Sequence, residues 1–245
     1  MRLATLVLAL VCLGPTNAET LSVAVASNFV PTARELAHDF KEETGHEVQI
    51  SAGSTGKLHT QILHGAPYDI FLAADEQSPR MLEESEHGVA GTRFVYARGV
   101  LILWSMDEKA TCSFHFDDLG QARLAIANPI TAPYGRAAKE FLELTGGWSK
   151  ISSQIVYGEN VAQALHFAAT SNARYAIVAK SQSLDPNLPQ ASCERHIPEE
   201  TYVAIKQEAL LLQRAASNPV AVEFLEYLRS DTGRDTIRRM GHRAP

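Results

Sequence analysis

The feature that most constrains the fold is a pattern that occurs twice near the amino end: a predicted strand, a short polar turn and a helix. The two copies are Leu21–Ala26, Ser27-Asn28 and Pro31–Glu43, and Glu47–Ile50, Gly53–Gly56 and about Lys57–His64. Repeated strand–turn–helix units predict an α/β fold with parallel strands. The two turns would then lie side by side at the carboxyl edge of one sheet, where open α/β sheets bind ligands.

The second turn, Gly53-Ser54-Thr55-Gly56, is a candidate anion site. It precedes a helix, whose first backbone N–H groups lack partners at the positive end of the helix dipole. A nucleotide-binding P-loop does not fit, because only two residues separate the glycines and Leu58, not Ser or Thr, follows Lys57. Ser54 and Thr55 could also serve merely as helix caps, and this stretch alone leaves that alternative open.

A third and a fourth polar turn follow predicted strands in the second half of the chain. One turn, Pro129–Gly135, separates the strand Leu124–Asn128 from a helix over Arg136–Thr145. The other, Glu159-Asn160, precedes a helix over Val161–Ala169. The remaining elements predicted here are strands at Ile155–Tyr157 and Tyr175–Ala179 and a polar loop over Ser181–Ser192. This second alternating set of strands and helices predicts a second lobe.

Two long β-rich runs, Arg93–Trp104 and Thr201–Leu212, are candidates for the connections between the lobes. We therefore predict a two-lobed clamshell in which lobe 1 contains residues 19–97 and 203–245, lobe 2 contains residues 98–202, and the two runs act as hinges. The other elements predicted in lobe 1 are an apolar strand at Asp69–Ala74 and helices at Gln77–Glu86, Pro219–Leu228 and Thr232–Met240.

The first eighteen residues have the features of a secretory signal peptide. Arg2 precedes an apolar run that is too short to span a bilayer, and small residues, Thr16 and Ala18, stand at the third-last and last positions before the expected cut. We predict a mature chain that starts at Glu19, and Cys12 lacks the small neighbours of a lipoprotein cleavage site. The expected location is an exported, oxidising compartment, where Cys112 and Cys193 are free to form a disulfide, although the sequence does not show that they meet.

Several other functions have little support. The net charge of −6 argues against nucleic acid as a partner. Neither GxSxG nor HExxH occurs in the sequence, and Lys57 and Lys180 have no evident acid or base partner, which argues against an enzyme. His59 and His64 are five residues apart on one predicted helix and face different directions, so they do not indicate a metal site.

Five motifs, taken together and in this order, resemble the ModA family of periplasmic molybdate-binding proteins of ABC importers. They are Ala26-Ser-Asn-Phe, Ser51-Ala-Gly-Ser-Thr-Gly-Lys-Leu, Gly65-Ala-Pro-Tyr-Asp-Ile-Phe-Leu-Ala-Ala-Asp, Asn128-Pro with Ala132-Pro-Tyr-Gly, and Gly158-Glu-Asn-Val-Ala-Gln-Ala. The resemblance covers essentially the whole mature chain. It implies a type II periplasmic-binding-protein clamshell, a monomer without a cofactor, that holds an oxyanion in the interlobe cleft and delivers it to an inner-membrane ABC permease.

The resemblance also implies the binding residues. Lobe 1 would contribute Ser27, Asn28, Ser54 and Thr55, and lobe 2 would contribute Tyr134 and Val161 through backbone N–H groups. The expected ligand is molybdate or tungstate, held by neutral donors and without direct protein ligands to the metal, while sulfate, phosphate or a small organic acid remain alternatives. Each residue also has a purely structural interpretation: Asn28 as a turn residue, Tyr134 as a packed aromatic and Val161 as core.

The chain departs from many relatives at two places, Val203-Ala204 and Gly241-His242. Many relatives have a proline at the first place and an aromatic residue at the second. We expect these departures to affect the hinge and the carboxyl-terminal tail and not the anion.

Overall fold

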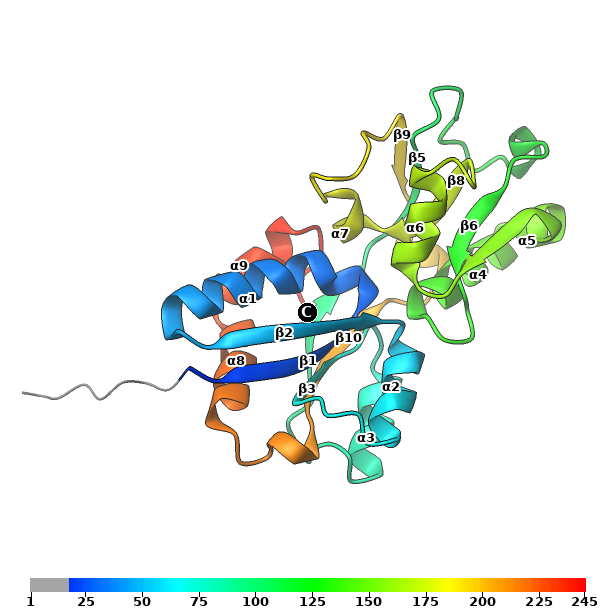
Figure 1. Cartoon of the computed structure of the whole chain (residues 1–245). Coiled ribbons are helices and arrows are strands. Elements are labelled where there is room, and N and C mark those ends of the chain that lie inside the picture. Colours follow the sequence, from blue (N-terminus) through cyan, green and yellow to red (C-terminus); the bar gives the residue numbers. More distant parts are fainter. Residues whose placement is uncertain (1–17) are drawn as a thin grey trace, which may run out of the picture.

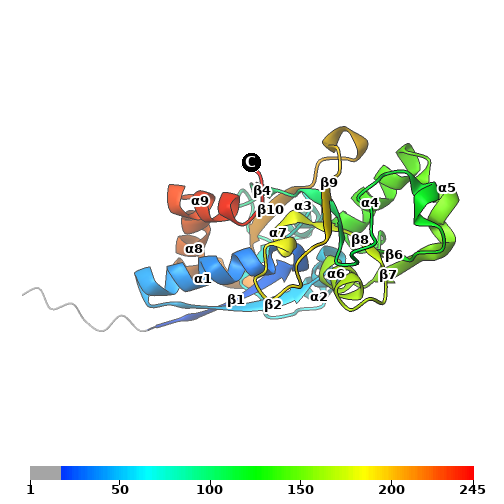
Figure 2. The same ribbon diagram turned by 90° about the horizontal axis from the view of Figure 1, so that it is seen from above.

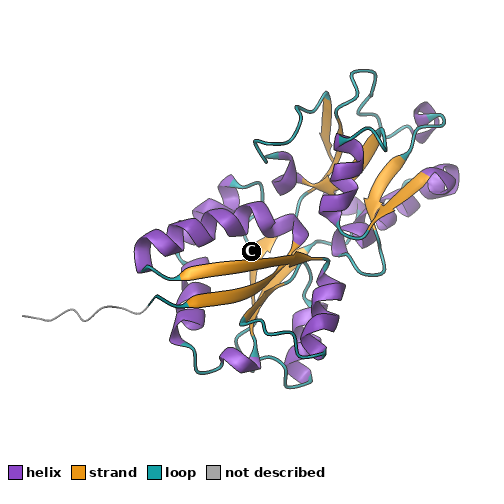
Figure 3. Ribbon diagram, viewed as in Figure 1, coloured by secondary structure: helices purple, strands orange, loops and turns teal. Residues whose placement is uncertain are grey.

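Two five-stranded sheets, each flanked by helices, form two lobes that lie beside each other (Figures 1 and 3). This arrangement comes from a computed structural model that describes residues 18–245. The predicted signal peptide lies outside the described residues except for Ala18. The predicted α/β clamshell is confirmed, and we refer to the lobes that contain the first and the second sheet as lobe 1 and lobe 2.

The sheet of lobe 1 has the strand order β2-β1-β3-β10-β4, in which β1 is parallel to β2 and β3, and β10 is antiparallel to β3 and β4. Its strands are β1 (Thr20–Ala26), β2 (Glu47–Gly53), β3 (Ile70–Leu72), β4 (Phe94–Arg98) and β10 (Lys206–Leu211). Its helices are α1 (Val30–Thr44), α2 (Thr55–Leu63), α3 (Gln77–Glu84), α8 (Pro219–Arg229) and α9 (Asp231–Arg239), with 3-10 turns η1 (Ser27–Phe29) and η5 (Gln213–Ala215).

Both faces of this sheet are covered. Along β3, Ile70 and Leu72 join the core formed with α1 and α8, whereas Phe71 joins a second core with Leu58 of α2 and Leu82 of α3. Alternate side chains therefore enter opposite cores, as the period of two in a strand requires. The predicted apolar strand is therefore present over these three residues and buried on both faces.

The sheet of lobe 2 has the order β7-β6-β8-β5-β9, in which β6 is parallel to β7 and β8, and β5 is antiparallel to β8 and β9. Its strands are β5 (Leu101–Ser105), β6 (Leu124–Ala127), β7 (Ile155–Gly158), β8 (Tyr175–Ala179) and β9 (Cys193–His196). Its helices are α4 (Pro133–Leu144), α5 (Gly147–Ile151), α6 (Val161–Ala169) and α7 (Lys180–Ser183), with 3-10 turns η2 (Phe116–Leu119), η3 (Ser152–Gln154) and η4 (Glu199–Thr201).

The first predicted connection between the lobes is confirmed. The run Arg93–Trp104 divides at Gly99-Val100, so that β4 belongs to the first sheet and β5 to the second. The second connection differs from the prediction, because β10 begins at Lys206 and not at Thr201. Val203 is 75% exposed, and its backbone N–H donates to the Glu140 carboxylate at 2.8 Å, so this segment has a side-chain partner in place of a strand.

Three further boundaries differ from the sequence predictions. Helix α2 begins at Thr55 and α4 begins at Pro133, each two or three residues earlier than expected. The predicted loop Ser181–Ser192 contains most of α7, whose Ser181 and Gln182 are buried against lobe 1. The edge strand β9 was also missed, because its sequence Cys-Glu-Arg-His has no apolar alternation.

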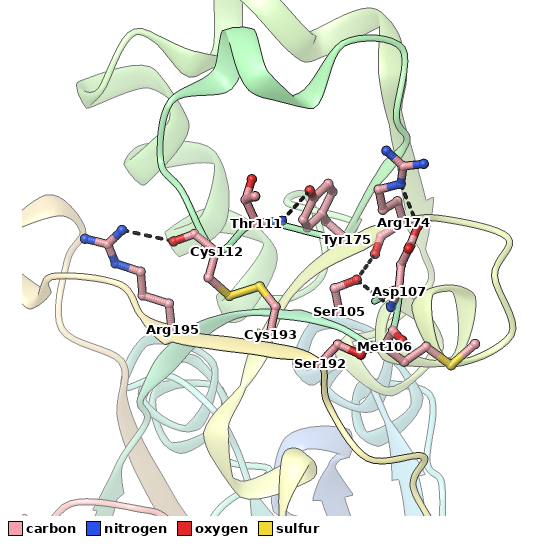
Figure 4. The surroundings of a disulfide bond; sticks show 10 residues. All are labelled: Ser105, Met106, Asp107, Thr111, Cys112, Arg174, Tyr175, Ser192, Cys193 and Arg195. Carbon is pink, nitrogen blue, oxygen red and sulfur yellow. Dashed lines mark hydrogen bonds and ion pairs between the residues drawn. A yellow bond between two sulfur atoms is a disulfide. The ribbon is translucent and has the colours of Figure 1, made fainter. Parts of the chain in front are cut away.

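Cys112 and Cys193 form a disulfide with their Cα atoms 5.5 Å apart (Figure 4). The bond joins the long segment after β5 to the edge strand β9. Neighbouring hydrogen bonds support the same connection: Arg195 donates to the Cys112 carbonyl at 3.0 Å, and the Ser192 hydroxyl donates to the Met106 carbonyl at 2.8 Å. The disulfide therefore ties the segment after β5 to the edge of the lobe 2 sheet.

The carboxyl-terminal tail returns to the sheet of lobe 1. Arg98 and Arg243 exchange two backbone hydrogen bonds, each 3.0 Å long, so the tail lies beside β4 just before the chain crosses to lobe 2 (Figure 2). None of the helices formed by residues 18–245 has the length and the apolar composition needed to cross a membrane.

Candidate functional site

Four turns that follow parallel strands meet where the two lobes face each other. Two follow β1 and β2 in lobe 1, and two follow β6 and β7 in lobe 2. One small cavity, with a volume of about 10 Å³, lies among them. All six residues predicted from the sequence line it, together with five neighbours; the lining is Ala26, Ser27, Asn28, Gly53, Ser54, Thr55, Ala74, Ala132, Pro133, Tyr134 and Val161.

Asn28 lies in the 3-10 turn that follows β1. Its side chain is 1% exposed, and its amide nitrogen donates to Oε1 of Gln207 at 2.7 Å. It does not have a positive φ, so the turn does not need the backbone tolerance of asparagine. Ser181 of lobe 2 donates to the Asn28 carbonyl at 2.8 Å, which holds this turn from the other lobe.

Ser54 and Thr55 stand at the start of α2 but do not cap it through their side chains. Ser54 occupies the capping position without a side-chain capping hydrogen bond, and its buried hydroxyl oxygen has no hydrogen-bond partner. The Thr55 hydroxyl instead accepts from the Ala74 amide at 3.0 Å, outside the helix, so its own hydrogen can be donated elsewhere. The capping alternative is therefore wrong for both residues.

Tyr134 is the second residue of α4 and is buried. Its hydroxyl oxygen has no hydrogen-bond partner of normal geometry. Burial raises the pKa of the Tyr134 phenol well above its usual value, and Tyr202 adds to this rise, while the nearby Asn28 amide opposes it. The phenol therefore remains a neutral O–H donor at physiological pH.

Val161 is the first residue of α6. Asn160 caps this helix by accepting from the Gln163 amide at 3.0 Å. The N–H of Val161 is among the amides that a helix start leaves without an intrahelical partner, and Val161 lines the cavity. Its backbone can therefore serve a ligand while its side chain packs in the core of lobe 2.

The electrostatic character of the cavity comes from helix starts and not from charged side chains. Thr55, Pro133 and Val161 are the first residues of α2, α4 and α6, and each lines the cavity. The lining residues that the structure describes are all uncharged. Three positive helix ends and several neutral donors make a site for a small anion.

Two of these donors also lack partners inside the protein. Leaving a buried polar group unsatisfied costs about 1–3 kcal/mol, and both Ser54 Oγ and Tyr134 OH are in this condition at the same cavity. One hydroxyl comes from each lobe. Their convergence points to a ligand with acceptor atoms on both sides.

Several contacts hold the lobes together around the cavity. The Gly56 amide donates to the Thr131 carbonyl at 2.9 Å, and Arg136 pairs with Asp75 at 2.6 Å. On the exposed side, Lys57 pairs with Glu159 at 3.0 Å. The structure is therefore a closed clamshell.

The sequence did not predict the residues that hold the first ligand turn in place through hydrogen bonds to Ser27 and Asn28. Gln207 was predicted only as part of a strand, and Ser181 and Gln182 only as part of a loop. The first three residues of β10 are Lys206, Gln207 and Glu208, all polar, so nothing in the sequence marks Gln207 as buried. No sequence signal relates Ser181 to Asn28, which is 153 positions away.

Comparison with known proteins gives a consistent picture. Residues 21–243 match the family described as bacterial extracellular solute-binding protein. The molybdate-binding protein ModA of Azotobacter vinelandii is 37% identical over 233 residues, which cover 92% of this chain and 90% of that protein. ModA of Rhodobacter capsulatus is 36% identical over 234 residues, with coverage of 93% and 90%.

A solved structure shows the same relationship. The periplasmic molybdate-binding protein of Azotobacter vinelandii superposes with a TM-score of 0.86 at 33% identity, covering 92% of this chain and 99% of that one. The chain therefore belongs to the bacterial extracellular solute-binding proteins and, within them, to the ModA family.

Proposed function

We propose that this protein captures molybdate or tungstate in the cavity between its lobes and delivers it, in the periplasm, to an ABC permease. The observation that carries the proposal is the convergence of three helix starts and two unpartnered buried hydroxyls, Ser54 and Tyr134, on one uncharged cavity. The names of the relatives support the same ligand. As solute-binding proteins, these relatives also favour a binding role over an enzymatic one.

The chemistry of the lining favours a fully deprotonated oxyanion. Ser54, Thr55, Asn28 and Tyr134 offer hydroxyl and amide donors, and no carboxylate is among the lining residues that the structure describes. Monohydrogen phosphate would bury its own proton without a charged acceptor, at a cost of about 1–3 kcal/mol. Molybdate, tungstate and sulfate are dianions without such a proton.

The size of the cavity favours a compact ligand. Two wider cavities lie between the lobes, one of about 310 Å³ beside Arg136 and one of about 240 Å³ beside Arg34. The cavity that contains the predicted residues is far smaller than either, so an amino acid, a sugar or an extended organic acid does not fit it. Sulfate must be discriminated by its shorter bonds, because its charge and shape are the same.

Closure follows from the placement of donors on both lobes. An anion that bridges Thr55 and Tyr134 gains contacts in the closed state that the open state cannot offer, and only such a difference shifts the equilibrium. We propose that residues 19–97 with 203–245, and residues 98–202, move as the two bodies. The protein would act as a monomer and without a cofactor.

A panel of oxyanions tests the proposed ligand. The purified mature protein should bind molybdate and tungstate tightly and sulfate at least tenfold more weakly, which corresponds to about 1.4 kcal/mol. Isothermal titration calorimetry with molybdate, tungstate, sulfate and phosphate measures this order, and a turnover assay in parallel tests for an enzyme. Sulfate binding as tight as molybdate binding would contradict the proposed ligand.

Replacing Gly56 tests the role of closure without touching a ligand donor. A Cβ at Gly56 would lie 3.1 Å from the Thr131 carbonyl oxygen and 3.2 Å from its Cα, both in lobe 2. Gly56→Ala should therefore weaken the 2.9 Å bond between the lobes and lower molybdate affinity about two- to tenfold, the worth of one neutral hydrogen bond.

The same substitution should not destabilise lobe 1. Alanine is favoured over glycine inside a helix by up to about 1 kcal/mol, so the melting temperature of the ligand-free protein should hold or rise. Calorimetry and thermal melts on the same variant measure both effects. Loss of affinity together with a lower melting temperature would show that the fold of α2, and not closure, had been affected.

A further inference from the structure

Four buried polar side chains form a continuous chain from the cavity to the carboxyl-terminal tail. Asn28 Nδ2 lies 2.7 Å from Gln207 Oε1, Gln207 Nε2 lies 3.2 Å from His242 Nδ1, and His242 Nε2 lies 3.0 Å from Thr32 Oγ1. All four side chains belong to residues that are at most 5% exposed. Water is therefore excluded, and each group depends on the next for its hydrogen bond.

The direction of these hydrogen bonds is set by what each group can donate or accept. Oε1 of Gln207 accepts from the Asn28 amide nitrogen at 2.7 Å. The Tyr96 hydroxyl lies 3.3 Å from the same Oε1 but makes its shorter hydrogen bond, at 3.0 Å, to the Ala73 carbonyl. With the amide nitrogen of Gln207 facing His242, the chain is complete when Nδ1 of His242 accepts and its hydrogen lies on Nε2, toward Thr32. Burial lowers the pKa of His242 to about 3, which agrees with a neutral ring at physiological pH.

From this chain we propose that His242 is a positioning residue for the anion site, orienting the Asn28 amide through Gln207. The inference rests on the proposed function, because it concerns how Asn28 presents its donor to an oxyanion. The two ends of a primary amide are nearly the same size, so packing alone does not decide which end is nitrogen. Within residues 18–245, the bond to Gln207 is the only hydrogen bond of normal geometry that the Asn28 side chain makes, and the Tyr134 hydroxyl also lies near it.

With Gln207 holding one N–H of Asn28, the same nitrogen has a second N–H for the ligand. If the side-chain amide of Gln207 rotated by half a turn, its NH₂ group would face Asn28. The Asn28 side chain would then have to present its carbonyl oxygen as the acceptor. The ends of the Asn28 amide would then be exchanged, and the donor geometry that the anion needs would be lost. A His242 ring with its hydrogen on Nε2 offers Gln207 an acceptor at Nδ1 and opposes this reversal, whereas the other tautomer would permit it, so the proposal includes the Nε2–H tautomer.

The tail that carries His242 is itself held in place. Arg243 exchanges backbone hydrogen bonds with Arg98 of β4, and the His242 ring lies 5.0 Å, centroid to centroid, from the ring of Phe29, the residue after Asn28. The proposal therefore differs from the expectation that Gly241-His242 affects the tail and not the anion. The tail instead supports the first ligand turn directly.

Two substitutions separate hydrogen bonding from packing. His242→Phe keeps a ring against Phe29 and removes the acceptor, whereas His242→Asn loses the ring but keeps an amide oxygen near the position of Nδ1. In calorimetric titrations, His242→Phe should bind molybdate about three- to tenfold more weakly than wild type, and His242→Asn should stay within about twofold.

Melting temperatures should follow the opposite order. His242→Asn leaves a partly empty site beside Phe29 and should melt below His242→Phe. A purely structural histidine would give the same order in affinity and in melting. Equal affinity of His242→Phe and wild type would overturn the positioning role.

A double-mutant cycle tests the route through Gln207. In a Gln207→Leu background, where Asn28 has already lost its partner, His242→Phe should cause no further loss of molybdate affinity. An additional loss equal to that in the wild-type background would show that His242 acts by another route and would overturn the inference.

One measurement needs no variant at all. Long-range proton–nitrogen NMR of the wild-type protein at pH 7 should show His242 with its hydrogen on Nε2, and a hydrogen on Nδ1 would contradict the proposed chain. The wild-type titration also separates the two levels of inference. Wild type that binds no molybdate overturns the proposed function and this inference with it, whereas tight wild-type binding that His242→Phe leaves unchanged overturns this inference alone.

Discussion

Molybdate should bind the Asn28→Ala and Thr55→Val variants about ten- to more than a hundredfold more weakly than the wild-type protein. A hydrogen bond to a charged group contributes about 1.5–3 kcal/mol, and each substitution removes one neutral donor from a cavity that offers no charged replacement. Thr55→Val keeps the side-chain shape and loses only the hydroxyl. Calorimetric dissociation constants and melting temperatures on the same samples measure the effect.

Two matched variants serve as controls for this prediction. Thr55→Ser retains the hydroxyl that accepts from Ala74 and should keep most of the affinity. Asn218→Ala removes an asparagine that caps α8 through the Val220 and Ala221 amides and is not among the cavity residues, so it should cost about 1 kcal/mol of stability and leave affinity unchanged. If Asn28→Ala behaved like Asn218→Ala, the anion site would have to lie elsewhere.

The sequence was sufficient to predict which turns converge, and the reason is geometrical. Each of the four turns follows a segment that could be predicted as a strand, and parallel strands place their carboxyl ends at one edge of a sheet. Ser27 and Ser54 could therefore be placed side by side from local patterns alone. The resemblance to the ModA family then identified Tyr134 and Val161 as their partners across the cleft.

The residues that orient the site could not be predicted, because they are distant in sequence and have no local signature. Gln207 is 179 positions from Asn28, and His242 is 35 positions further along. Both are polar residues in positions that pattern alone assigns to a strand or a tail. Only the folded structure shows that buried polar groups must satisfy one another.

The first connection between the lobes is closer to the site than a simple hinge requires. A Cβ at Gly99 would lie 2.2 Å from the Tyr134 hydroxyl oxygen, so the crossing chain packs directly against a residue of the cavity. Tyr202, in the second connection, lies near enough to raise the pKa of Tyr134. Tyr134 therefore lies near both connections between the lobes as well as at the cavity, which suits the proposed closure around the anion.

Of the single covalent changes possible in this protein, loss of the disulfide should lower the free energy of unfolding most. Cys112 and Cys193 are 81 positions apart, and in the chain-entropy model a closed loop of this length contributes about 4 kcal/mol as an upper-end value. Its loss would release the segment after β5 from β9 (Figure 4). The double variant Cys112→Ser, Cys193→Ser should therefore unfold at a distinctly lower denaturant concentration than the wild-type protein, because lobe 2 is destabilised.

Molybdate affinity well below the melting temperature should change little in that double variant, because neither cysteine is among the residues that line the cavity. Denaturant unfolding followed by circular dichroism, with the wild-type protein measured oxidised and reduced, gives the loss of unfolding free energy. The reduced wild type should match the double variant, since both lack only the cross-link. A count of two free thiols in the unreduced, denatured mature protein would refute the pairing, and a loss of affinity as large as that of Asn28→Ala would show that the disulfide also shapes the site.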